Sequence, residues 1–220
     1  FDAERIELTG EAVPIAEGLQ FSAISGRTAF AASENGVLAY RAGGAGVQRT
    51  LVWVSRNGTE QALPAPVRGY DFPRLSPDGS RVAVEIDTSN VWLYDIARGT
   101  STRLTFEGSA NQNPVWTPDG KRVVFFSNNK GGAVNLFWQL ADGSGGLERL
   151  STSDYAQVPG SWSPDGQVLA FHESNPKTSR DIWVLRLSDR KAQPFLRTPF
   201  TEGGVRFSPD GRWLAYMSNE

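Results

Sequence analysis

Short apolar runs alternate with polar, glycine-rich stretches along this chain, and both recur at a nearly constant interval. An apolar triplet begins at Leu38, Val82, Val123, Leu169 and Leu214, so successive copies are 44, 41, 46 and 45 residues apart. A period of about 40 to 45 residues is typical of four-stranded propeller blades. Helical repeats of similar length would place apolar residues at a 3.6-residue period, which these runs do not follow.

The polar stretch before four of these triplets is the same turn sequence, Ser/Thr-Pro-Asp-Gly. Its copies are Ser76–Gly79, Thr117–Gly120, Ser163–Gly166 and Ser208–Gly211, and the degenerate Ser33–Gly36 fills the place before the first triplet. Proline presets φ at the second turn position, aspartate hydrogen-bonds to the nearby backbone, and glycine accepts positive φ. We therefore predict a hairpin turn between the first two strands of each blade, with a structural role for its aspartate.

Residues 112 to 152 illustrate the order of strands expected in each repeat. Strands are predicted at 114–116, 123–126, 135–140 and 147–151, with turns or polar loops between them. The strand residues are almost continuously apolar instead of alternating with polar ones. This pattern is typical of sheets covered on both faces, as blades packed between neighbouring blades are.

Tryptophan residues recur at fixed places in the repeats. Trp116 and Trp162 stand two residues before the turn proline, and four more lie on predicted third strands: Trp53, Trp92, Trp138 and Trp183. A large flat side chain at a repeated blade position suits packing between layers. We predict that these tryptophans pack between blades and do not form a ligand cage.

The predicted fold is all-β, a single β-propeller segment of four-stranded antiparallel blades that spans residues 1–220. Four complete repeats are expected at residues 21–65, 66–107, 108–153 and 154–198. Residues 1–17 are expected to end a preceding blade, and residues 199–220 to supply the first two strands of a further blade. These two pieces could close one blade together, but we expect them to be the edges of a longer propeller.

Composition narrows the classes of partner. The formal net charge is −2 and the charged residues are dispersed, so there is no basic stripe for a nucleic acid. Cysteine is absent, which excludes disulfides and thiol catalysis. No apolar run approaches the roughly 18 residues of a membrane span, so this segment is not expected to insert into a bilayer. Because the chain starts at Phe1 and not at a methionine, we interpret it as a fragment, and the absence of a visible signal peptide leaves a removed leader or anchor open.

Candidate chemistry is sparse. His172 is the only histidine, no Gly-x-Ser-x-Gly nucleophile elbow is present, and Asp87–Asn90 lacks the carboxylates of a calcium loop. We predict that His172 lies at a strand end on the surface of a blade. The glycine-rich segment Gly43–Gly46 has no following helix and is interpreted as a loop. The sequence thus predicts no catalytic residue, no metal and no cofactor in this segment.

Binding residues are expected in the loops that join the fourth strand of one blade to the first strand of the next, at 66–71, 108–113, 154–158 and 199–204. These loops would surround the mouth of the central channel, although an ordinary solvated rim is the alternative. Arg74 and Arg206 precede their turn prolines by three residues and are expected near the channel. The candidate binding residues are Tyr70, Asp71, Arg74, Gln112, Asn113, Tyr155, Gln157, Glu202 and Arg206.

Several segments resemble the TolB-type, WD-like β-propeller repeat, namely Phe207–Tyr216, Trp162–Gly166 and Asp181–Trp183. The resemblance covers nearly the whole chain and implies the propeller fold. It implies no single function, because similar repeats occur in the periplasmic protein TolB, in tricorn-type and prolyl-oligopeptidase-type peptidases, and behind bacterial serine/threonine kinase domains. The partner implied by this group is a protein, a peptide or a small ligand.

A narrower resemblance involves Phe1–Arg5, Leu8–Glu11, Ala16–Gly18 and Ser33–Arg41, which resemble the C-terminal propeller of membrane-anchored bacterial serine/threonine kinases. In that family a kinase domain and one membrane helix precede the propeller, which lies outside the cytoplasm. The kinase motifs themselves are absent from this sequence. The resemblance implies the extracytoplasmic sensor or interaction domain of a receptor-like kinase.

Two alternatives remain open from the sequence. The first is a TolB-like periplasmic scaffold. The second is the substrate-gating propeller of a serine peptidase whose catalytic domain lies outside this segment. An upstream kinase, an upstream TolB-type domain or a downstream hydrolase elbow would distinguish the three cases.

Overall fold

The computed structural model describes residues 21–22, 27–28, 30–32, 38–40 and 48–220. The chain divides into two compact units, residues 1–46 and 47–220, which are considered separately. In the first unit, β1 (Phe21–Ser22) pairs with β2 (Arg27–Thr28), and β3 (Phe30–Ala32) pairs with β4 (Leu38–Tyr40). The segment 1–17, the degenerate turn Ser33–Gly36 and the loop Gly43–Gly46 lie outside the described residues. The predictions made for them remain predictions.

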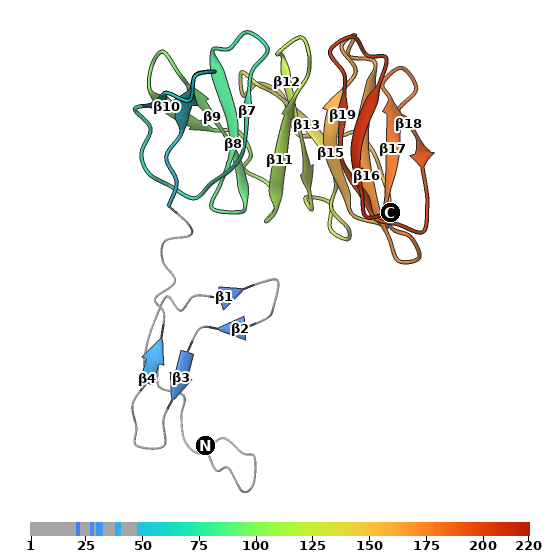
Figure 1. Ribbon diagram of the computed structural model, residues 1–220, viewed down its shortest axis with the longest axis horizontal. Coiled ribbons are helices and arrows are strands. Elements are labelled where there is room, and N and C mark those ends of the chain that lie inside the picture. Colours follow the sequence, from blue (N-terminus) through green and yellow to red (C-terminus); the bar gives the residue numbers. More distant parts are fainter. Residues whose placement is uncertain (1–20, 23–26, 29, 33–37, 41–47) are drawn as a thin grey trace, which may run out of the picture. The chain divides into compact units, whose positions relative to one another are not determined.

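The described part of the second unit is built from antiparallel strands (Figure 1). It begins with the pair β5 (Val52–Val54) and β6 (Glu60–Ala62) and ends with the pair β19 (Glu202–Phe207) and β20 (Leu214–Ser218). Between these pairs, residues 70–196 form three four-stranded sheets. Their strands are β7 (Tyr70–Leu75), β8 (Arg81–Ile86), β9 (Asn90–Asp95) and β10 (Thr100–Arg103); β11 (Asn111–Trp116), β12 (Arg122–Ser127), β13 (Asn135–Leu140) and β14 (Glu148–Arg149); and β15 (Gln157–Trp162), β16 (Val168–Asn175), β17 (Ser179–Arg186) and β18 (Lys191–Leu196).

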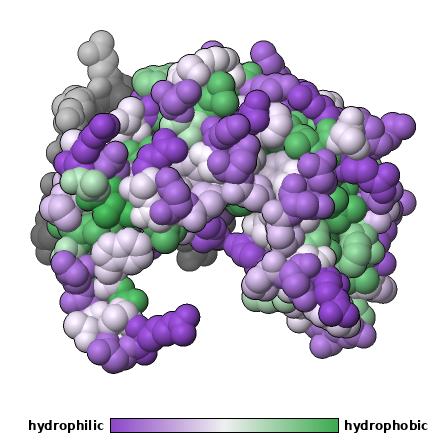
Figure 2. Space-filling model, turned by 90° about the horizontal axis from the view of Figure 1, so that it is seen from above, coloured by the Kyte–Doolittle hydropathy of each residue, from purple (hydrophilic) through white to green (hydrophobic). Residues whose placement is uncertain are grey.

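Neighbouring sheets pack face to face, and their first strands meet along the inner side of the arrangement. Strand β11 contacts β7, β15 contacts β11, and β19 contacts β15. When the molecule is viewed from above, at 90° to the view of Figure 1, the described residues of this unit curve around a hollow (Figure 2). The predicted all-β propeller is therefore confirmed.

The repeated turn has the geometry that its sequence predicts. In the first copy, the amide of Gly79 donates to the carbonyl of Ser76 at 2.9 Å, and Gly79 has φ +73°. The Asp78 carboxylate accepts from the Ser76 hydroxyl at 2.5 Å and from the Ser80 amide at 3.1 Å. These bonds hold the pKa of Asp78 down to about 2. The same side-chain arrangement recurs at Asp119, Asp165 and Asp210.

The hydrophobic core lies in layers between the sheets. Phe125 and Phe137 of the second four-stranded sheet pack with Val91 of the first, and all three are almost completely buried. In the next layer, the rings of Trp138 and Trp162 stack with centroids 6.5 Å apart. Burial on both faces explains why the strands are nearly continuously apolar. Packing between sheets is thus the role of these tryptophans, whereas Trp53 on the two-stranded β5–β6 pair is 40% exposed.

Candidate binding cavity

A bulge interrupts the first strand of each sheet in the region 70–207. The pairing with the second strand shifts between Asp71 and Arg74 in β7, and at the matching place in β11, β15 and β19. In three of these four strands the residue five positions before the turn proline has positive φ: Phe72 at 49°, Asn113 at 55° and Gly204 at 63°. A bulge adds one residue to one strand, bends it and redirects its side chains.

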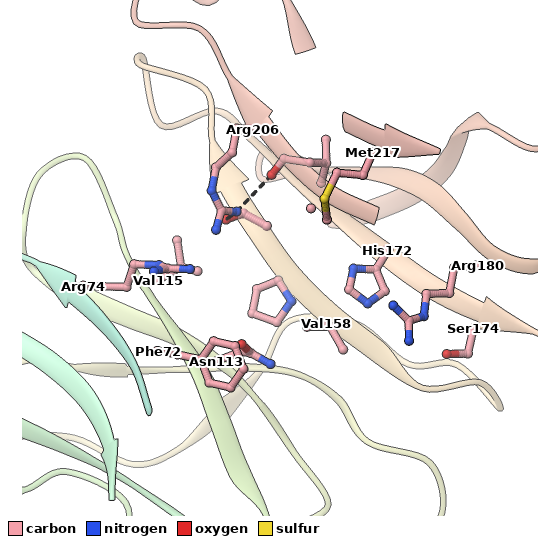
Figure 3. A pocket seen from close by; sticks show the side chains of 14 residues that line it. Phe72, Arg74, Asn113, Val115, Val158, His172, Ser174, Arg180, Arg206 and Met217 are labelled. Carbon is pink, nitrogen blue, oxygen red and sulfur yellow. Dashed lines mark hydrogen bonds between the residues drawn. The ribbon is translucent and has the colours of Figure 1, made fainter. Parts of the chain in front are cut away.

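The bulged strands enclose a cavity of about 460 Å³ (Figure 3). This volume lies in the usual range of ligand pockets, roughly 300 to 1,000 Å³. Its wall comes from β7, β11, β15 and β19, with further residues from β16, β17 and β20. The lining residues are Phe72, Arg74, Asn113, Val115, Val158, Pro159, Gly160, His172, Ser174, Arg180, Gly204, Val205, Arg206 and Met217.

Two guanidinium groups enter this space from different strands, Arg74 from β7 and Arg206 from β19 (Figure 3). Arg206 is held in place by bonds from Nη1 to the carbonyls of Gly160 and of Val205, the latter at 3.0 Å. Arg74 donates from Nη1 to the carbonyl of Pro73 at 3.1 Å. Burial, and the positive charge of Arg206, lower the pKa of Arg74; burial also lowers the pKa of Arg206.

Gly160 allows the wall to close around Arg206. A Cβ atom at this position would lie 2.5 Å from Cγ1 of Val205 and 2.8 Å from the Val205 carbonyl oxygen. Separations below 3.0 Å do not occur for real Cβ atoms, so β15 and β19 approach this closely because the residue is glycine.

His172 and Arg180 form another part of the wall. His172 lies in the middle of β16, half-buried, and not at a strand end on the blade surface as the sequence suggested. The hairpin of β16 and β17 extends beyond the expected strand, which places His172 opposite Ile182 inside the ladder. Burial and the charge of Arg180 lower the pKa of His172 to about 4, so the imidazole is neutral at pH 7.

No aspartate or glutamate belongs to the described lining of the cavity, although a buried carboxylate lies close to it. Glu85 of β8 is 2% exposed, and one of its carboxylate oxygens has no partner among the described residues. The backbone amide of Asn113 donates to this carboxylate, but burial prevails and raises the pKa of Glu85 to about 7. The cavity therefore presents three arginines and a neutral histidine.

Three of the nine predicted binding residues line this cavity: Arg74, Asn113 and Arg206. Three others point into the sheets and are buried. Tyr70 donates its hydroxyl to the carbonyl of Pro66 at 2.6 Å, Gln157 donates to Glu173 at 2.8 Å, and Glu202 accepts from the Thr198 hydroxyl. Their exposed fractions are 3% or less, so these side chains do not lie on a solvated rim.

The remaining three predicted residues lie outside the cavity lining. Asp71 forms an ion pair with Arg49, Gln112 donates to the carbonyl of Thr88, and Tyr155 is 43% exposed in the loop before β15. Most of the residues assigned to loops belong to first strands, because these strands continue through the bulge in front of the proline. Most residues in front of the bulge are polar or glycine, so a criterion based on apolar runs starts these strands too late.

Sequence reasoning missed eleven of the lining residues. Aligning the copies on the turn proline would have found Phe72, Pro159 and Gly204, which share a position with Asn113, and also His172 and Met217, which both follow their proline by eight residues. Arg180 carries no such signal, because it lies near the start of the third strand, β17, where the distance from the turn proline varies with the length of the β16–β17 hairpin.

Metal binding has no evident site in the ranges that the structure describes, where no group of three or more His, Cys, Asp or Glu side chains could hold an ion. No helix of those ranges is long and apolar enough to cross a membrane.

Comparison with known proteins identifies one family. A model described as the TolB beta propeller domain matches residues 46–220 of this chain. This range contains the repeated turns from Ser76 onward and every residue of the cavity wall.

Individual relatives are more distant. The uncharacterized peptidase YuxL of Bacillus subtilis is 28% identical over 191 residues, which cover 67% of this chain and 29% of YuxL. Tricorn protease homolog 1 of Streptomyces coelicolor is 31% identical over 131 residues, or 59% of this chain and 11% of that protein. Among solved structures, TolB from Acinetobacter baumannii superimposes with a TM-score of 0.57 at 20% identity, covering 75% of this chain and 47% of that one. The chain thus spans about three tenths of YuxL and about half of this TolB.

Proposed function

Because the chain belongs to the TolB β-propeller family, we propose that it is a non-enzymatic binding module that receives a segment of a protein or peptide in the cavity between its first strands. The observation that carries this proposal is the cavity itself. Four bulged strands of a repeated scaffold present different side chains at matching positions, around a volume of about 460 Å³. Variable side chains on a regular scaffold are typical of binding sites.

The composition of the wall supports a polypeptide ligand. Phe72, Val158 and Met217 supply apolar surface, whereas Asn113 and Arg74 supply hydrogen-bonding groups. Bulges also leave backbone groups outside the ladder of the sheet, where they can bond to a peptide backbone. A mixed wall of this kind fits a peptide better than it fits a purely apolar compound.

The location and role of the protein to which this segment belongs are a separate proposal. Membership in the TolB family supports a place on the extracytoplasmic side, as a scaffold or interaction domain. The assignment as the sensor domain of a receptor-like kinase rests on the sequence resemblance of segments within Phe1–Gly18 and Ser33–Arg41, of which the structure describes only residues 38–40. Similarity to YuxL and to a tricorn homolog favours a second candidate, a propeller that gates substrate entry to a peptidase domain elsewhere in the protein.

Selection of displayed random dodecapeptides against the 220-residue chain tests the binding function. Val158→Trp fills the cavity from β15, and Gln193→Trp places the same side chain on the exposed strand β18 as the control. We expect the selected peptides to bind the V158W variant at least about tenfold more weakly than the wild type, and the Q193W variant equally well. Peptides that bind V158W as tightly as the wild type would contradict a cavity site.

A further inference from the structure

We infer that Arg74 and Arg206 form a subsite for an anionic group of the ligand, a carboxylate presented by an acidic side chain or by a peptide C-terminus. This inference deepens the proposed function and rests on it for the kind of ligand, a polypeptide.

The first argument is the uncompensated positive charge of the cavity. Arg74, Arg180 and Arg206 all contribute to the wall, and no carboxylate does so among the described residues. Like charges that share a partly dehydrated space repel one another, and an anion between them removes that cost. The lowered pKa of Arg74 has the nearby charge of Arg206 as one of its causes.

The second argument concerns hydrogen bonds that are still available. A guanidinium has five N–H donors. Among the described residues, Arg74 uses one nitrogen to bond Pro73, and Arg206 uses one nitrogen to bond two carbonyls. The remaining nitrogens of both groups are available to a planar carboxylate, which arginine binds in a bidentate manner.

The third argument is that the subsite is held in place from both sides. The guanidinium of Arg206 donates to the Gly160 carbonyl of the neighbouring sheet. The backbone of Arg74 is held as well, because its carbonyl accepts the indole N–H of Trp116 at 2.9 Å. A preorganised pair loses less conformational entropy when the anion binds.

The backbone strain at Phe72, in the cavity wall, also supports a ligand site here. Phe72 has φ 49°, is 46% exposed and stands two residues before Arg74 in the bulge. A bulky residue in the left-handed region is a conformational outlier, and such outliers concentrate at ligand sites. The strained residue therefore lies beside the proposed subsite and presents its ring to the same cavity.

Four fluorescein-labelled nonapeptides of Ala, Ser and Gly serve as probes. Three have an amidated C-terminus and carry a central pair of Asp, of Asn or of Lys; the fourth carries the Asn pair with a free carboxylate. Binding to the 220-residue chain is measured by fluorescence polarisation at low and at high salt, with inorganic sulfate as a competitor. The variants are Arg74→Gln, Arg206→Gln and Arg206→Lys, with the exposed hairpin residue Arg56→Gln as the control.

We expect the Asp peptide, the free-carboxylate peptide, or both, to bind at least about tenfold more tightly than the amidated Asn peptide, with the difference declining as salt rises. Which of the two binds identifies the source of the carboxylate. R74Q and R206Q lose this preference, R206K keeps part of it, and R56Q behaves as the wild type. Melting temperatures of all variants show that the folded state is retained.

Other outcomes separate the two proposals. Equal binding of acidic and amidated Asn peptides, unchanged in R74Q and R206Q, overturns the anion subsite and leaves the binding module standing. Binding of sulfate measured by titration calorimetry, if it depends on both arginines and occurs without binding of any peptide, supports the subsite and contradicts a polypeptide ligand. If neither the peptides nor sulfate bind to the wild type, the inference is wrong.

Discussion

The indole N–H of Trp116 donates to the backbone carbonyl of Arg74 at 2.9 Å, across the boundary between two neighbouring sheets. Trp116, which packs between the sheets, is therefore hydrogen-bonded to the backbone of Arg74, which lines the cavity. Trp116 itself is 7% exposed and lies under the guanidinium of Arg81, 5.0 Å from its ring centroid. The core between the first two four-stranded sheets thus helps to fix the position of Arg74.

Removing this bond should destabilise the fold. We expect Trp116→Phe to lower the free energy of unfolding by about 1 to 3 kcal/mol, because it leaves the Arg74 carbonyl without its donor and opens space in the core. Urea unfolding measures the change. Trp213→Phe is the matched control, since Trp213 is 69% exposed and should change stability by less than about 0.5 kcal/mol.

The glycine of the repeated turn should tolerate no β-branched residue. Gly120 has φ +67°, and a Cβ there would make only ordinary contacts, at 3.6 Å from Pro77. The penalty for Gly120→Val is therefore conformational, about 1 to 3 kcal/mol, and should appear as a clear fall in melting temperature. Gly146→Val is the control, because Gly146 lacks positive φ and has no atom within 4 Å of the added Cβ. Equal melting of both variants would show that the turn is wrongly placed.

Phe72 should illustrate a conflict between stability and binding. Replacing Phe72 with Asn, the residue at the matching position 113, should relieve the strain of φ 49° and raise stability by about 0.5 to 1 kcal/mol. The same change removes an aromatic surface from the cavity, so affinity for selected peptides should fall. Tyr155→Asn replaces a similarly exposed aromatic residue without positive φ, and should not stabilise the chain. A destabilised F72N variant would mean that ring contacts outweigh the strain.

Glu85 should make the protein less stable as the pH rises. Burial raises its pKa from the ordinary value of 4.5 to about 7 in the folded state, so the folded state binds more protons between these values. The contribution of Glu85 to stability is therefore greatest below pH 4.5 and is lost as the pH rises through about 7. Glu85→Gln keeps an acceptor for the Asn113 amide and removes this decline. Thermal melting from pH 4 to 8 compares the two proteins; parallel curves would show that Glu85 ionises normally.

His172 should contribute the opposite slope. Burial lowers its pKa from the ordinary value of 6.5 to about 4 in the folded state, so the unfolded chain binds more protons in this window. Stability therefore rises as the pH increases from 4 to 6.5. In the wild type the pH dependences contributed by Glu85 and His172 oppose each other. Replacing one of these residues leaves the contribution of the other. We expect His172→Gln to lose stability steadily from pH 4.5 to 7, whereas E85Q gains stability up to pH 6.5. A His172→Gln curve that parallels the wild type would contradict this.

The repeated unit of this protein can be predicted from the amino-acid sequence alone. Ser76–Gly79 and its copies specify a turn because proline, aspartate and glycine each satisfy a local backbone requirement. The apolar runs that follow predicted strands buried on both faces, and Val123 to Phe126 are indeed buried throughout. These features depend on neighbours in the sequence or on the period of the repeat, so they needed no knowledge of the assembled sheets.

Which side chains face the cavity depends on the assembled sheets. Side chains of a strand alternate between its two faces, and the extra residue of a bulge exchanges the faces beyond it. Tyr70 and Arg74 would share a face in a regular strand; with the bulge between them, Tyr70 is buried in the sheet and Arg74 lines the cavity. Glu202 and Arg206 are separated in the same way. Arg74 and Arg206 come together because strands 132 residues apart in the sequence meet around one hollow, which no local pattern encodes.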